Sequence, residues 1–141
     1  MNLLTYCKQL RPDDWTRMVN NHWTIKDCVA HMVGWEKECV KELKITWATQ
    51  CDPWFMRTNN WDDFNRESVT FYQNFTPEQL LAEWEKWQRE MEELKNKIGE
   101  DKLKQAGEKF AWVFDQWDPD DEGNRSHNDY HLKQIIKSLK N

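Results

Sequence analysis

The sequence lacks several features that would assign it to a common class of protein. Its basic residues form no stripe, and the 141-residue chain carries a net charge of −5 with a pI of about 5.4. Because binding to duplex nucleic acid requires clustered Lys and Arg, we expect no nucleic-acid partner. No apolar run approaches the roughly 20 residues of a membrane span, so we expect no membrane association either.

Export signals, paired cysteines and common catalytic motifs are missing as well. The N-terminal stretch MNLLTYCKQLRPDD has neither the long apolar segment nor the cleavage site of a signal peptide, which favours a cytoplasmic protein. The four cysteines form no CxxC pair, and we interpret them as reduced thiols. The sequence contains no GxSxG, P-loop, GxGxxG or HExxH motif, so these motifs assign no enzyme class.

What the chain has instead is tryptophan at helical spacing. Ten tryptophans supply much of the apolar surface of a chain that is 32% charged, with a mean hydropathy of −1.04. Apolar residues recur at intervals of three and four, as in amphipathic helices that pack around one core. The length suits one domain, residues 1–141. We therefore predict an all-α domain built as a four-helix bundle.

Capping patterns predict where the helices begin and end. Thr24 followed by Asp27, and Thr76 followed by Gln79, are typical of capping boxes at helix starts, and Gly99 favours a helix end. The conformation of the aromatic stretch KFAWVFDQW stays open. The predicted helical segments are residues 3–19 with an interruption at Pro12, 24–49, 61–73, 76–98 and 126–139.

Three histidines lie at the edges of apolar helix faces. At about 100° per residue, His31 lies at one edge of the apolar stripe of its helix. His127 and His131 share a face of the last helix, because residues four apart lie one above the other. Such a pair can chelate one ion, and three imidazoles leave coordination positions free for water or substrate. The alternative is a pair of exposed histidines, and we interpret His22 as a surface residue.

Three stretches resemble the DinB/YfiT-like superfamily, which includes the N-terminal domains of mycothiol-dependent maleylpyruvate isomerases and the ClbS/DfsB proteins. SHNDYHLKQI is similar to its closing H-x-x-x-H helix, and NWDDFN is similar to the W-x-x-x-N region of ClbS/DfsB-type members. WTIKDCVAHMVGWE is similar to the signature of its second helix. The matching residues of that signature are Trp23, Thr24, Lys26, Asp27, His31, Trp35 and Glu36.

The resemblance implies an up-down-down-up four-helix bundle that holds one divalent metal ion, with Zn and Ni as first candidates, on His31, His127 and His131. It also implies a small-molecule substrate or thiol, and a metal-dependent hydrolase or thiol transferase that acts on a small electrophile. A homodimer is compatible with the resemblance and with the ten tryptophans. Two alternatives stay open, namely a ClbS/DfsB-like resistance hydrolase without a metal and a non-enzymatic bundle that binds a small ligand.

Further residues are candidates for supporting roles at this site. We expect Trp35, Trp61 and Trp112 to line an apolar pocket beside the histidines. Asp27 or Asp129 could accept a hydrogen bond from an imidazole and so fix its tautomer, although Asp27 also fits a helix cap. Such an acceptor orients a histidine ligand without touching the metal.

Two other patterns offer competing chemistry. Cys28, three residues before His31, is an alternative nucleophile or metal ligand. The acidic stretch DPDDEGNRSHND, residues 118–129, follows part of the spacing of an EF-hand loop. Its last position is Asp129, whose side chain is too short for the bidentate glutamate that calcium requires there. We therefore interpret this stretch as a solvated turn.

Overall fold

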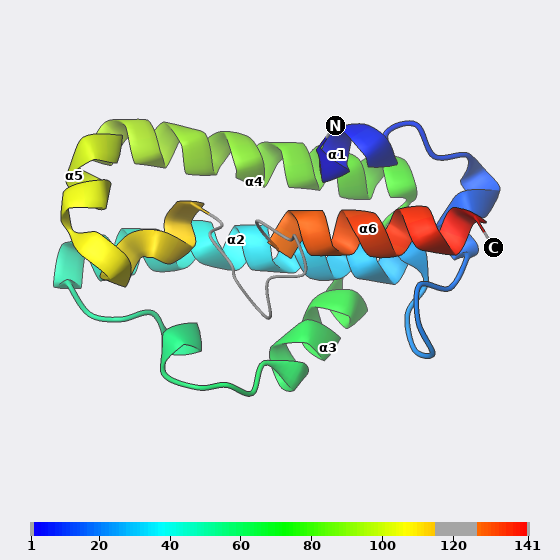
Figure 1. Ribbon diagram of the computed structural model, residues 1–141, viewed down its shortest axis with the longest axis horizontal. Coiled ribbons are helices and arrows are strands. Elements are labelled where there is room, and N and C mark those ends of the chain that lie inside the picture. Colours follow the sequence, from blue (N-terminus) through cyan, green and yellow to red (C-terminus); the bar gives the residue numbers. More distant parts are fainter. Residues whose placement is uncertain (1, 115–126, 141) are drawn as a thin grey trace.

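The computed structural model describes residues 2–114 and 127–140, which fold into an all-α bundle (Figure 1). Helices α2 and α4 run in one direction, and α1 and α6 run in the opposite direction (Figure 1). The predicted up-down-down-up bundle is therefore confirmed. The helices are α1 (Leu3–Cys7), η1 (Pro12–Thr16), α2 (Ile25–Thr49), η2 (Trp54–Met56), α3 (Asp62–Phe71), α4 (Pro77–Ile98), α5 (Glu100–Gln105), η3 (Gly107–Phe114) and α6 (His127–Lys140).

The first predicted segment is divided into α1 and the 3₁₀-helix η1. Pro12 is the first residue of η1, where its missing N–H costs no helical hydrogen bond. The backbone N–H of Arg11 donates to Asp14 Oδ2 (2.8 Å) and closes this turn. As a result α1 has only five residues and forms a short wall of the bundle.

Helix α2 has the predicted boundaries because its ends are fixed by local hydrogen bonds. The N–H of Asp27 donates to Thr24 Oγ1 and the N–H of Thr24 donates to Asp27 Oδ2, and both donor–acceptor distances are 3.1 Å. The helix ends at Thr49, where Gln50 adopts a left-handed conformation (φ 59°). Asp27 is therefore a capping residue. The left-handed end without glycine was not predicted.

Helix α4 also begins as predicted, with reciprocal bonds between Thr76 and Gln79, and it ends at Gly99, whose φ is 102°. After Gly99 the chain forms the short helix α5, which was not predicted. The aromatic stretch whose conformation stayed open forms η3 up to Phe114.

Buried apolar side chains form two clusters along α2. The first cluster surrounds the N-terminal half of α2 and contains Trp84 of α4 and Ile135 of α6. The second surrounds the C-terminal half of α2 and contains Leu103 of α5 and Phe110 of η3. Trp87 packs against both. The aromatic and helical segments after α4 therefore cover the end of the core that α1 and α6 leave open (Figure 1).

Helices α2 and α3 approach each other very closely at Gly34. A Cβ atom at this position would lie 2.6 Å from Ser68 Cβ and would also overlap Ser68 Oγ. The glycine therefore allows α3 to pack directly on the backbone of α2.

Replacing Gly34 with alanine is expected to lower the free energy of unfolding by about 1–3 kcal/mol, because the added methyl group forces the two helices apart. Urea denaturation measures the change. The double variant Gly34→Ala/Ser68→Gly removes the obstructing side chain and should recover most of the loss. Equal stability of Gly34→Ala and the wild type would contradict the close approach.

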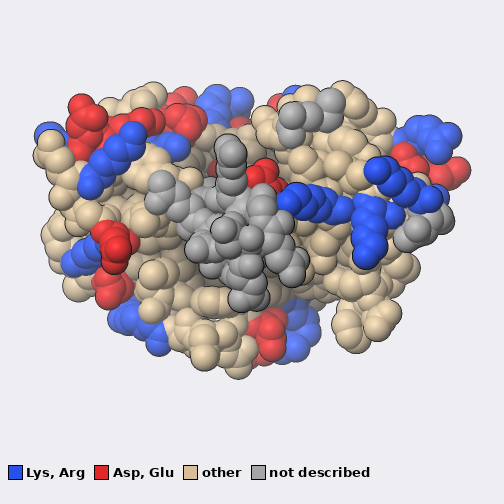
Figure 2. Space-filling model, viewed as in Figure 1, with Lys and Arg blue, Asp and Glu red and all other residues tan. Residues whose placement is uncertain are grey.

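Charged side chains of both signs lie interspersed on the face shown in Figure 2. Every helix in residues 2–114 and 127–140 is too short or too polar to cross a membrane.

Candidate metal centre

Three histidines that are distant in the sequence lie together where α2 meets α6. His31 belongs to the first half of α2, and His127 and His131 belong to the first two turns of α6. His127 Nε2 lies 3.3 Å from His31 Nε2 and 2.9 Å from His131 Nε2. The donor nitrogens of this histidine triad all lie within 4.8 Å of one another. The convergence expected from the sequence is present.

The spacing of these nitrogens suits a shared metal ion. Bonds of 2.0–2.1 Å from zinc to imidazole place neighbouring ligand nitrogens roughly 2.9–3.4 Å apart. Two of the observed distances, 2.9 and 3.3 Å, fall in that range. The triad is therefore compatible with a divalent metal ion that all three rings would contact.

Hydrogen bonds among the three rings cannot give every converging nitrogen a partner as well as a shared cation would. Each imidazole nitrogen carries either one proton or one lone pair in the ring plane, so it has one strong direction of bonding. His127 Nε2 nevertheless faces the Nε2 atoms of both other rings. A cation at the point of convergence accepts all three lone pairs at once.

Burial keeps the triad in the neutral form that binds metals. Burial, and secondarily His131, lowers the pKa of His31 from about 6.5 to about 3, although Asn65 acts in the opposite direction. Burial and the two neighbouring histidines hold the pKa of His127 well below its usual range. Burial lowers the pKa of His131 to about 4, against a hydrogen bond with Gln134 that raises it. All three imidazoles are therefore unprotonated on one nitrogen at neutral pH.

Gln134 fixes the orientation of His131. His131 Nδ1–H donates to Gln134 Oε1 (2.8 Å), and the amide NH₂ of Gln134 faces the Tyr130 hydroxyl (3.5 Å). A proton on Nδ1 leaves the Nε2 lone pair directed at His127. Asp129 was one of the residues predicted for such a role. Gln134 was not predicted, although it stands three residues after His131 and so on the same helix face.

Cys28 contacts the outer side of the triad. Its Sγ lies 3.3 Å from His131 Nδ1, the nitrogen that faces away from His127. Burial raises the pKa of the Cys28 thiol to about 12. The buried thiol therefore stays protonated at neutral pH, and it lies on the side of the His131 ring that faces away from His127.

A cavity of about 340 Å³ opens beside the triad, and His127 is part of its lining. Trp35 and Trp112 line it, as the sequence predicted. Trp61 was expected there too, but it packs on Trp35 and donates its Nε1–H to the carbonyl oxygen of Phe55 (2.9 Å). That part of the prediction is wrong, because Trp61 lies behind Trp35 and its indole is held by the backbone of η2 instead of facing the cavity.

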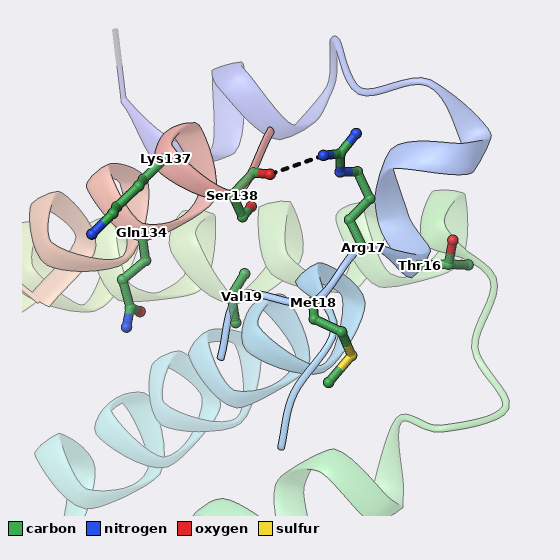
Figure 3. A pocket seen from close by; sticks show the side chains of 7 residues that line it. All are labelled: Thr16, Arg17, Met18, Val19, Gln134, Lys137 and Ser138. Carbon is green, nitrogen blue, oxygen red and sulfur yellow. Dashed lines mark hydrogen bonds between the residues drawn. The ribbon is translucent and has the colours of Figure 1, made fainter. Parts of the chain in front are cut away.

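A larger cavity of about 590 Å³ lies between the segment after η1 and the last turns of α6 (Figure 3). At its edge Arg17 Nη2 donates to the carbonyl oxygen of Ser138 (3.2 Å; Figure 3). Gln134 lines it, but no triad histidine does. We therefore take the smaller cavity as the candidate small-molecule site. Residues 118–126 of the acidic stretch lie outside the described residues, whereas its last three residues form the start of α6.

Fold and site together define an all-α bundle protein with a buried three-histidine cluster compatible with a divalent metal ion. A family model described as the DinB superfamily matches residues 1–135. The chain belongs to the DinB superfamily, which confirms the resemblance stated from its second and last helices. A search of curated proteins and a search of solved structures each found no match.

Proposed function

We propose that His31, His127 and His131 bind one divalent metal ion, with Zn and Ni as first candidates, and that the protein is a metal-dependent hydrolase or thiol transferase acting on a small electrophile. This proposal is supported by the convergence of three neutral imidazoles, in which the Nε2 atoms of His31 and His131 both face His127 Nε2. A bound divalent ion supplies Lewis-acid chemistry, which polarises an electrophile and lowers the pKa of a water or thiol.

The cavity beside His127 supplies the binding surface for the small molecule. Trp35 of α2 and Trp112 of η3 offer aromatic faces to the apolar part of a ligand. Gln88 and Lys95 of α4 line the same cavity and offer hydrogen-bond donors to a polar group. Because His127 belongs to both the triad and the lining, a ligand there would lie next to the proposed metal position.

Metal binding is tested with protein that carries no histidine tag. After treatment with a chelator, titration with Zn²⁺ or Ni²⁺ is expected to show one tight site per chain. At a free metal concentration of about 100 times Kd, binding should raise the free energy of unfolding by about 2.7 kcal/mol and the melting temperature by roughly 5–10 °C. Mg²⁺ serves as the control, because it prefers oxygen ligands. Zinc and nickel titrations without stoichiometric binding would remove the basis of the proposal.

A second candidate function follows from the cavity itself. A tryptophan-lined cavity of about 340 Å³ can bind a small ligand without a metal, as in a sequestering bundle or a ClbS/DfsB-like hydrolase. Chelator-treated wild type and a His131→Ala variant separate the two candidates. Full ligand turnover or ligand affinity in both would favour the metal-free function, whereas loss in both would favour the metal-dependent one.

A further inference from the structure

We propose that Asn65 of α3 is a positioning residue for the histidine triad. In this proposal the side-chain carbonyl of Asn65 accepts the Nδ1–H of His31 and so directs His31 Nε2 toward His127. This inference rests on the proposed metal site. It assigns a function to α3, which lies outside the four bundle helices but packs on α2 (Figure 1).

The first observation is a buried nitrogen without a partner. His31 Nδ1 is buried and makes no hydrogen bond, while Nε2 of the same ring faces His127. A histidine that binds a metal through one nitrogen almost always donates the proton of the other to an acceptor. His131 has such an acceptor in Gln134, and His31 requires one of its own.

The second observation places an acceptor at Trp35, one helical turn from His31. Asn65 Oδ1 accepts the indole Nε1–H of Trp35 (2.7 Å), and Trp35 lies one turn after His31 on the same face of α2. A carbonyl oxygen has two lone pairs, so Oδ1 can accept a second hydrogen bond. The Asn65 side chain also raises the pKa of the His31 imidazole against the effect of burial, as an acceptor near the ring does.

The third observation explains how α3 holds Asn65 in place. Gly34 lies between His31 and Trp35 in the sequence, and Ser68 lies one turn after Asn65. The close approach of Gly34 and Ser68 therefore fixes α3 against the part of α2 that carries both rings. Trp35 is held in turn by Phe64 and Trp54, whose ring centroids lie 4.4 and 5.8 Å from its own. The Asn65 amide is therefore held on a rigid support rather than on a mobile loop.

If Asn65 had a purely structural role, it would act only by holding Trp35. Comparing Asn65→Ala with Trp35→Phe distinguishes this structural role from the positioning of His31. Asn65→Ala removes the acceptor for both rings, whereas Trp35→Phe removes the indole donor and leaves the Asn65 carbonyl in place. Asn65→Asp keeps an acceptor of the same size. Thr70→Ala, at an exposed position on α3, is the matched control.

Zinc affinity, measured by competition with a chromogenic chelator, is the first readout. We expect Asn65→Ala to bind zinc 10- to 100-fold more weakly than the wild type, a range typical for loss of a hydrogen-bond partner of a metal-binding histidine. Asn65→Asp and Thr70→Ala should remain within about threefold of the wild type, and Trp35→Phe should lose less than Asn65→Ala. Equal losses in Trp35→Phe and Asn65→Ala, or a folded Asn65→Ala variant with wild-type affinity, would overturn the inference.

The tautomer of His31 in metal-free protein is the second readout, and it separates this inference from the proposed function. Nitrogen-15 NMR of the imidazole is expected to show the proton on Nδ1 in the wild type and in Asn65→Asp, and a shift toward the Nε2–H form in Asn65→Ala. An unchanged tautomer in Asn65→Ala counts against the inference even if zinc binds. If the wild type binds no zinc, the proposed function fails, and the NMR result alone decides whether Asn65 orients His31.

Discussion

Replacing His131 with alanine is expected to weaken zinc or nickel binding by roughly 100- to 1000-fold. Structural zinc sites with four ligands bind with about 10–16 kcal/mol, so the loss of one ligand costs about 3–4 kcal/mol of binding free energy. The Nδ1 atom of His131 is already hydrogen-bonded to Gln134. The His131 ring therefore needs the least reorientation to bind a metal ion. Isothermal titration of chelator-treated protein measures the change.

His22 provides the matched control for this experiment. It is exposed in the turn before α2, and its backbone N–H donates to Asn20 Oδ1 (2.8 Å). His22→Ala should therefore bind metal as tightly as the wild type. His127→Ala should match His131→Ala, because His127 Nε2 faces both other nitrogens. Stoichiometric, tight metal binding in His131→Ala would show that the triad is not the site.

Acidification of the metal-free protein from pH 7 to pH 5 is expected to lower the free energy of unfolding by about 2 kcal/mol for each triad histidine. Burial lowers the pKa of His31 to about 3 and that of His131 to about 4, and it lowers that of His127 as well. In the unfolded chain each histidine titrates near pH 6.5. Between these values the unfolded state binds more protons than the folded state, so stability falls as the pH falls.

Urea denaturation at pH 7, 6 and 5 in the presence of a chelator tests this expectation. The double variant His127→Gln/His131→Gln removes two of the three titrating groups, so its loss of stability between pH 7 and pH 5 should be smaller by about 4 kcal/mol. Comparing each protein with itself at two pH values cancels the effect of the substitutions on stability at pH 7. If the wild type and the double variant show the same pH dependence, the triad does not titrate as a buried neutral cluster.

The helices that were predicted well are those whose ends depend on neighbouring residues. Thr24 and Asp27 at the start of α2, and Thr76 and Gln79 at the start of α4, form the reciprocal bonds that their spacing indicates. The left-handed end of α2 at Gln50 was missed, because glutamine carries no signal for that conformation.

The supporting groups of the site show where sequence reasoning stopped. Gln134 was readable in principle, since it is three residues from His131 on the same helix. Asn65 belongs to the stretch that resembles ClbS/DfsB-type members, but its position beside Trp35 depends on the packing of α3 on α2. The cavity assignment of Trp61 failed for a similar reason, because the position of its indole behind Trp35 depends on a hydrogen bond to the backbone of Phe55 in η2.

The sequence by itself determined the all-α class, the main helix boundaries and the position of each triad histidine at the edge of an apolar stripe. Those features depend on hydrogen bonds and side-chain periodicity within a few residues of the chain. Only the tertiary structure decided that His31 meets His127, 96 residues away, with both Nε2 atoms facing each other. The contact between these two histidines depends on which edges of α2 and α6 pack together. That choice of edges depends on the packing of all the helices around the core.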